Sequence, residues 1–142
     1  MKQVQFEKVM PSNEQIKVLF DLLEQRLHRI SCKEISYREH QRFVKSHPYR
    51  DWFLIRVRSE YVGSFYVSKE NTIGINVWDE HTPLAVPCII NFVKKNFKPL
   101  PAIPSVRNGN FAINVPQSSV HLARSLEAIG ARVAQVTYFM PG

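Results

Sequence analysis

The sequence predicts a single domain of the mixed α/β class over residues 1–142, with elements in the order β-α-α-β-β-β-α-β-α-β. Three observations favour this class. Apolar residues follow helical spacing before and after the middle of the chain. In the middle, apolar and polar residues alternate as in strands. Three strand-like runs in the middle are separated by short turns, which is typical of an antiparallel meander. No repeat or low-complexity segment divides the chain into parts.

The first part of the chain predicts one strand and two helices. Alternation of apolar and polar residues over Gln3–Val9 indicates a strand. A long amphipathic helix follows from Ser12 to about Ile30, and a shorter one from Ser36 to about Lys45. Each helix begins with a serine followed three residues later by glutamine or glutamate, which is the pattern of a capping box. The second helix is expected to end before the next proline.

The middle of the chain predicts a three-stranded meander. The strands are expected over Trp52–Val57, Tyr61–Val67 and Thr72–Trp78. The first has a continuous apolar run, and alternate residues of the third place its aliphatic side chains on one face. The turns between the strands are short, so each strand is expected to pair with the next in an antiparallel sense.

A helix is predicted directly after the meander. Thr82 resembles an N-cap, and Pro83 then occupies the first helical position. The apolar stretch Leu84–Val93 forms the body of this helix. Pro87 removes one helical hydrogen bond, so we expect either a kink there or a helix that properly begins at Pro87.

The last third of the chain predicts a strand, a helix and a final strand. The strands are expected over Asn110–Val115 and Ala131–Met140, both from alternating apolar residues. The helix between them is expected to begin at Ser118 or Ser119 and to stop at Gly130.

This order of elements, at this length, resembles the GNAT superfamily of acyl-CoA N-acyltransferases. Three features carry the resemblance, which covers nearly the whole chain. Phe53–Val77 is similar to the central antiparallel strands of the family, with Val62-Gly63 on a hairpin. Ile75-Asn76-Val77 leads straight into a helix. Ser125–Ala131 is similar to the end of the family's last helix.

The resemblance implies acyl transfer, most simply of an acetyl group, from acetyl-CoA or another acyl-CoA to an amine of a small molecule or protein. In the family the fourth strand diverges from the fifth, the pantetheine arm enters the gap, and the pyrophosphate binds the N-terminus of the next helix. The matching cofactor-binding residues are Asn76, Val77, Thr82, Leu84, Ala85 and Asn114.

The stretch that matches the family's phosphate-binding loop, Glu80–Ala85, departs from its pattern of Gln/Arg-x-x-Gly-x-Gly/Ala. Only Ala85 matches. Glu80 replaces a cation or amide, and Pro83 replaces a glycine and removes an N–H donor. We expect any compensating positive charge to come from Lys94, Lys95 or Arg107. These changes leave open an alternative: a non-catalytic GNAT-like module that binds a protein partner or nucleic acid.

The catalytic residues are the least determined part of this interpretation. The tyrosine that many relatives carry on the last helix is matched by Leu126, which cannot donate a proton. Tyr138 and His40 are the candidates that remain, with Tyr66 also available. A packing role is the competing interpretation for the tyrosines, and a half-exposed surface position for the histidine.

The composition adds expectations about partners and compartment. The formal net charge is +7, but the cations are scattered, so a nucleic-acid partner is possible in principle and disfavoured by the pattern. Two distant cysteines predict free thiols and, with no apolar signal or membrane segment, a cytoplasmic protein. The five histidines show no metal-binding spacing, so no metal is expected. A homodimer is left open.

Overall fold

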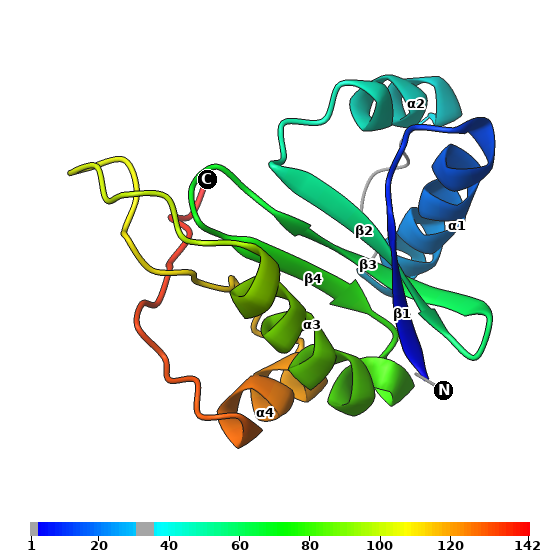
Figure 1. The fold of residues 1–142 in the computed structure, drawn as a ribbon. Coiled ribbons are helices and arrows are strands. Elements are labelled where there is room, and N and C mark those ends of the chain that lie inside the picture. The colour runs from blue at the N-terminus through cyan, green and yellow to red at the C-terminus, as the bar shows by residue number, and fades with distance from the viewer. Residues whose placement is uncertain (1–2, 31–35) are drawn as a thin grey trace.

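The structure, a computed structural model, describes residues 3–30 and 36–142, and for residues 26–30 it describes the backbone alone (Figure 1). It confirms the mixed α/β class. Its strands are β1 (Val4–Lys8), β2 (Asp51–Val57), β3 (Glu60–Val67) and β4 (Ile73–Val77). Its helices are α1 (Asn13–Ile30), α2 (Tyr37–Lys45), α3 (Thr82–Asn96) and α4 (Val120–Ala128), with a 3-10 turn η1 (Asp79–His81) before α3.

The four strands form one antiparallel sheet in the order β1-β2-β3-β4. The register places Phe6 beside Ile55 and Phe65 beside Ile75. A bulge shifts the β2–β3 register after Ile55. Short turns explain the meander from β2 to β4, as predicted, and β1, which precedes the two helices in the chain, pairs with the other edge of β2.

Helices cover both faces of the sheet (Figure 1): α1 and α2 lie on one face, and α3 lies on the other with α4 beside it. The core under α3 is the larger and includes Phe53, Phe65 and Ile89. The core under α1 and α2 includes Ile16, Trp52 and Leu54. Alternation along the strands sends successive side chains to opposite cores, which is the reason that both faces are apolar.

The predicted helix starts at Ser12 and Ser36 are confirmed. The Gln15 N–H donates to Ser12 Oγ at 3.2 Å, and the Glu39 N–H donates to Ser36 Oγ at 3.1 Å. At the other end of the chain, Gly130 follows α4 at φ +94°, as expected for a helix stop.

The prediction for the start of α3 was wrong in one respect. The residue that caps α3 is His81, and Thr82 is already helical, which places Pro83 one position further into the helix. The reason is the 3-10 turn η1, which leads directly into α3. The helix runs through Pro87 and does not begin there.

The two late strands were also predicted wrongly. Over Asn110–Val115 only Ala112 makes a strand-like contact, an isolated parallel bridge with Thr72. Ala131–Met140 forms no strand, and its apolar residues are exposed, Tyr138 to 86% and Phe139 to 95%. Alternation satisfies one requirement of a strand, but a strand also needs a neighbour with free backbone groups. Neither segment lies against such a partner along its length.

Within the ranges that the structure describes, none of the helices is long and apolar enough to cross a membrane.

Candidate functional site

The outer edge of β4 is the feature around which the candidate site is built. β4 pairs with β3 on one side only. On its other side, the chain touches it at its beginning through Ala112, whose N–H donates to the Asn71 carbonyl at 2.9 Å and whose carbonyl accepts from the Ile73 N–H at 2.9 Å. Beyond that bridge, β4 has no neighbouring strand in the described part of the chain.

The hydrogen bonds at the two ends of β4 fix which backbone groups face this open edge. The Ser68 N–H donates to the Thr72 carbonyl, and the Trp78 N–H donates to the Val62 carbonyl. Even-numbered residues therefore point their backbone groups toward β3, and odd-numbered residues point outward, because the pattern alternates in an antiparallel pair. The outward N–H and C=O groups of Ile75 and Val77 have no hydrogen-bond partner among the described residues.

Residues after Ala112 diverge from β4. Ile113 and Val115 pack toward α3 and α4, in a small core with Val86, Leu122 and Leu126. Ile75 of β4 packs against the same core. Beyond the parallel bridge between Thr72 and Ala112, the backbone of this segment forms no further strand pairing with β4.

Asn71 holds this point of divergence. Its side chain is 1% exposed, and its Nδ2 donates to the carbonyls of Leu100 (2.8 Å) and Asn108 (2.7 Å). Its Oδ1 accepts from the Leu100 N–H at 2.7 Å. The residue has φ +63°, a conformation that asparagine tolerates better than most residues. The turn before β4 and the loop before Ala112 are thereby tied together.

The N-terminus of α3 follows β4 directly and is poor in hydrogen-bond donors. The first four N–H groups of a helix normally lack helical partners. Here the His81 N–H donates to the Trp78 carbonyl, the Thr82 N–H donates to the Asp79 carbonyl, and Pro83 has none. The N–H groups of His81 and Thr82 are therefore used within the 3-10 turn, and Pro83 lacks one. Of these first four residues, Leu84 is the one whose N–H remains. Asp79 and Glu80, both exposed, add negative charge beside it.

A groove beside this helix start supplies positive charge. It has a volume of about 270 Å³ and lies between α3 and α4, where Pro83 and Pro87 face His121, Arg124 and Ser125. Arg124 is exposed and makes no ion pair with the described residues. Pro83, in the first turn of α3, lines the groove together with Arg124, and no acidic residue lines it.

The cations that were expected to compensate for the acidic start of α3 lie elsewhere. Arg107 donates through Nε to the Pro101 carbonyl at 2.7 Å and through a terminal nitrogen to the Lys69 carbonyl at 3.3 Å. Lys94 and Lys95 lie in the last turn of α3, about 16–18 Å along the axis from Pro83 at 1.5 Å per residue. Arg124 is therefore the cation that sequence reasoning missed, since no local pattern brings α4 beside the start of α3.

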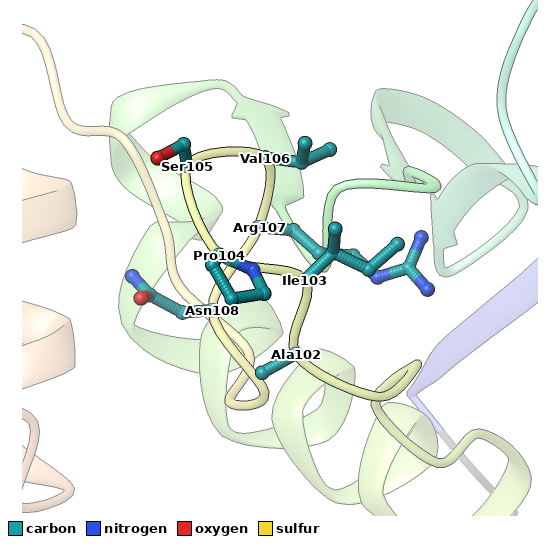
Figure 2. Close-up of a pocket in the computed structure, with 7 residues that line it drawn as sticks. All are labelled: Ala102, Ile103, Pro104, Ser105, Val106, Arg107 and Asn108. Carbon is teal, nitrogen blue, oxygen red and sulfur yellow. The ribbon is translucent and has the colours of Figure 1, made fainter.

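A second cavity, of about 350 Å³, is formed by the single loop Ala102–Asn108 (Figure 2). The loop closes on itself through the Ile103 N–H, which donates to the Arg107 carbonyl at 3.0 Å. Ser105 and Val106 point away from one another at its tip. All lining residues come from this loop, so the cavity brings together no groups from the β4 edge or from α3.

The predicted cofactor-binding residues fall into different environments. Val77 presents its backbone at the open edge, whereas Asn76 turns its backbone to β3 and its side chain away from α3. Thr82 is 3% exposed and donates through Oγ1 to the Trp78 carbonyl at 3.0 Å. Ala85 is fully buried, and Leu84 and Asn114 are exposed. Ile75 was missing from the prediction, because the open edge of a sheet is not encoded in local sequence.

The two candidate catalytic residues belong to different parts of the fold. His40 is 6% exposed on α2 and faces α1, with its ring 5.4 Å from that of Phe20. Burial lowers the pKa of His40, and a hydrogen bond with the Ile16 backbone opposes that shift. Its Nε2 has no partner among the described residues. Tyr138 lies in the exposed C-terminal segment. Leu126 is 6% exposed in the core between α3 and α4.

No group of three His, Cys, Asp or Glu side chains in residues 3–30 and 36–142 is arranged to hold a metal ion.

Comparisons with known proteins add a likeness of fold. No family model matches the sequence, and no curated protein matches it. Among solved structures, a ribosomal-protein-alanine N-acetyltransferase from Brucella melitensis biovar Abortus 2308 has a TM-score of 0.64 at 14% identity, covering 99% of this chain and 100% of that one. The N-acetyltransferase PseH from Campylobacter jejuni has a TM-score of 0.61 at 11% identity, covering 96% and 92%. An aminoglycoside acetyltransferase from a soil metagenome, solved with sisomicin, has a TM-score of 0.61 at 11% identity, covering 99% and 96%.

Proposed function

We propose that this chain, which has the fold of the GNAT-type acetyltransferases, is an acyl-CoA-dependent N-acyltransferase. The observation that carries the proposal is the open edge of β4. The outward backbone groups of Ile75 and Val77 lie where the neighbouring segment diverges, and they have no partner among the described residues. A pantetheine arm, which carries two amides, can pair with such an edge as another strand would.

The phosphates of coenzyme A would then lie beyond Val77, at the start of α3. The helix dipole favours negative charge there, although Pro83 and the 3-10 turn leave few N–H donors. Asp79 and Glu80 oppose binding. We therefore assign the phosphate contact chiefly to the Arg124 guanidinium, with His121 beside it in the same groove. This site relies on side-chain charge where a glycine-rich loop relies on backbone donors.

The reaction would be a direct transfer. The lone pair of a neutral amine attacks the thioester carbonyl carbon, a C–N bond forms, and the C–S bond breaks. The nitrogen loses a proton and the sulfur gains one, so that an amide and a free thiol result. An outward N–H of β4 is placed to donate to the carbonyl oxygen as negative charge develops on it, and the edge strand holds the thioester in position.

Isothermal titration with acetyl-CoA tests the proposal. We expect saturable heat at ligand concentrations up to a millimolar, competed by coenzyme A. Dephosphorylated pantetheine derivatives should bind more weakly, because they lose the Arg124 contact. No heat at millimolar acetyl-CoA would rule out the enzyme.

The alternative, a non-catalytic module of the same fold, is favoured by one observation: the donor-poor, acidic start of α3. A partner or nucleic acid would then use the scattered cations that give the net charge of +7. A labelled RNA or DNA probe would shift at low salt and be released as salt rises. A protein that binds acetyl-CoA and gives no such shift excludes the nucleic-acid form of this alternative.

A further inference from the structure

Tyr66 crosses from β3 over the neighbouring strand β4. Tyr66 pairs with Gly74 in the sheet register, and both residues lie on the face of the sheet that α1 and α2 cover. A Cβ placed on Gly74 would overlap Cε2 and Cζ of the Tyr66 ring and lie 2.6 Å from its hydroxyl oxygen. The outer end of the ring therefore occupies the space that any other residue at position 74 would fill.

The position of this ring is fixed by its neighbours. Tyr49 stacks on Tyr66 with ring centroids 3.8 Å apart and planes 9° from parallel. Tyr49 in turn meets Trp52 edge to face at 5.2 Å and stacks on His47 at 5.5 Å. Such contacts favour one arrangement of the rings. The Tyr66 ring is thus held between Tyr49 and the backbone of β4.

The hydroxyl of Tyr66 lies over β4, the strand that forms the open edge. The Tyr66 ring extends over β4, the last strand of the sheet, and its hydroxyl oxygen lies 2.6 Å from the Cβ position of Gly74. Gly74 is adjacent to Ile75, whose N–H points outward. The hydroxyl makes no hydrogen bond with the described residues, and the residue is half-buried, so a donor is held in place without a protein acceptor.

We propose that the Tyr66 hydroxyl is the proton donor for the sulfur that leaves at the β4 edge. This inference rests on the proposed function and assigns a role that Leu126, buried between α3 and α4, cannot perform. As the C–S bond breaks, the electron pair stays on sulfur, and the Tyr66 O–H gives its proton to it. The phenolate is reprotonated by the proton that the new amide nitrogen releases through solvent. Gly74 is the positioning residue, because it leaves room for the ring.

The experiment compares binding of coenzyme A with binding of desulfo-coenzyme A, which lacks the thiol, at pH 7 and pH 9. Both ligands are titrated into the wild-type protein, Tyr66→Phe and Tyr138→Phe. The Phe variant keeps the ring stacked on Tyr49 and removes only the oxygen. Tyr138→Phe is the matched control, since that hydroxyl is on an exposed segment.

For the wild type, we expect the preference for coenzyme A over desulfo-coenzyme A to rise roughly fivefold between pH 7 and pH 9. The fraction of coenzyme A present as the thiolate increases over this range, and a hydroxyl donor stabilises the thiolate. Tyr66→Phe should lose this rise while binding desulfo-coenzyme A and unfolding in urea as the wild type does. Tyr138→Phe should keep the rise.

Four results would overturn the inference. An equal pH-dependent rise in Tyr66→Phe and wild type, or no rise in either, removes the proton donor and leaves the proposed function standing. Weaker binding of desulfo-coenzyme A by Tyr66→Phe would show that the residue is only structural. Failure of the wild type to bind either ligand would remove both the inference and the proposed function.

Discussion

The side chain of Asn71 forms a two-point hydrogen bond with the backbone of Leu100: Nδ2 donates to the Leu100 carbonyl at 2.8 Å, and the Leu100 N–H donates to Oδ1 at 2.7 Å. These residues are 29 positions apart and belong to the turn before β4 and the loop after α3. The backbone of Asn71 also accepts from Ala112. One buried asparagine thereby sets where the next segment leaves β4, which is the geometry on which the candidate site depends.

Asn71→Ala is expected to lower the free energy of unfolding by about 2–4 kcal/mol, because it removes the three hydrogen bonds that this buried side chain makes with the backbone of Leu100 and Asn108. Urea denaturation measures this change. Asn110→Ala, at an exposed position, is the control and should unfold with the wild type. Equal stability of Asn71→Ala and wild type would contradict the role given to this side chain.

Gly63 and Gly74 each lie too close to another part of the sheet for a larger residue, but the neighbouring group differs. A Cβ at Gly63 would overlap the backbone carbonyl of Asn76, whereas a Cβ at Gly74 would overlap the end of the Tyr66 ring. Backbone cannot move without loss of strand pairing, and a side chain can rotate. We therefore expect Gly63→Ala to cost about 1–3 kcal/mol and Gly74→Ala to cost less. The reverse order in urea denaturation would be inconsistent with the structure.

Arg124→Ala is expected to weaken acetyl-CoA binding about fivefold, which corresponds to the value of about 1 kcal/mol for an exposed charge pair. The difference from wild type should shrink as salt is added. Lys95→Ala removes a cation at the far end of α3 and is the control. Titration calorimetry measures both variants, and a larger loss for Lys95→Ala than for Arg124→Ala would place the phosphates elsewhere.

The stability of the fold should depend on His40 in mildly acid solution. Burial lowers the pKa of His40 in the folded protein, so the unfolded chain, at about 6.5, takes up the proton first. The contribution is present above pH 6.5 and is lost as pH falls below it, with a slope of no more than about 1.4 kcal/mol per pH unit for one proton. Burial also lowers the pKa of His47, against an opposing Asp51 charge, with the same sign.

His40→Asn tests this dependence, since an asparagine amide can take the place of Nδ1 beside the Ile16 backbone and does not titrate. Urea denaturation at pH 5.5 and pH 7.5 should show a smaller loss of stability in the variant than in the wild type. His47→Asn, measured under the same conditions, gives the separate contribution of His47 to the pH dependence of stability. An unchanged pH dependence in His40→Asn would mean that folding does not lower the pKa of His40.

The first two thirds of the fold could be predicted from sequence because their signals are local. Capping serines, alternation and short turns specify β1 to β4 and the helices between them, and the structure has them at nearly the predicted bounds. The predicted strand over 131–140 depended on a partner that no local pattern supplies. The start of α3 was shifted because a 3-10 turn at Asp79–His81 differs little in composition from the loop predicted there.

The site was predictable only in outline. The junction from Val77 into a helix indicated the candidate site, and Pro83 indicated that its proposed phosphate end is unusual. The roles proposed for Ile75, Arg124 and Tyr66 depend on sheet order, on packing of α4 on α3, and on the absence of a side chain at Gly74. These are relations between distant parts of the chain, and a single sequence does not contain them in any local spacing.

The central claim is that the open edge of β4 binds the pantetheine arm of an acyl-CoA, and amide hydrogen exchange followed by NMR tests it most directly. On addition of acetyl-CoA, the N–H groups of Ile75 and Val77 should become protected from exchange. Those of Gly74 and Asn76, already bonded to β3, should be protected both with and without ligand. Unchanged exchange at Ile75 and Val77 in saturating acetyl-CoA would contradict the account.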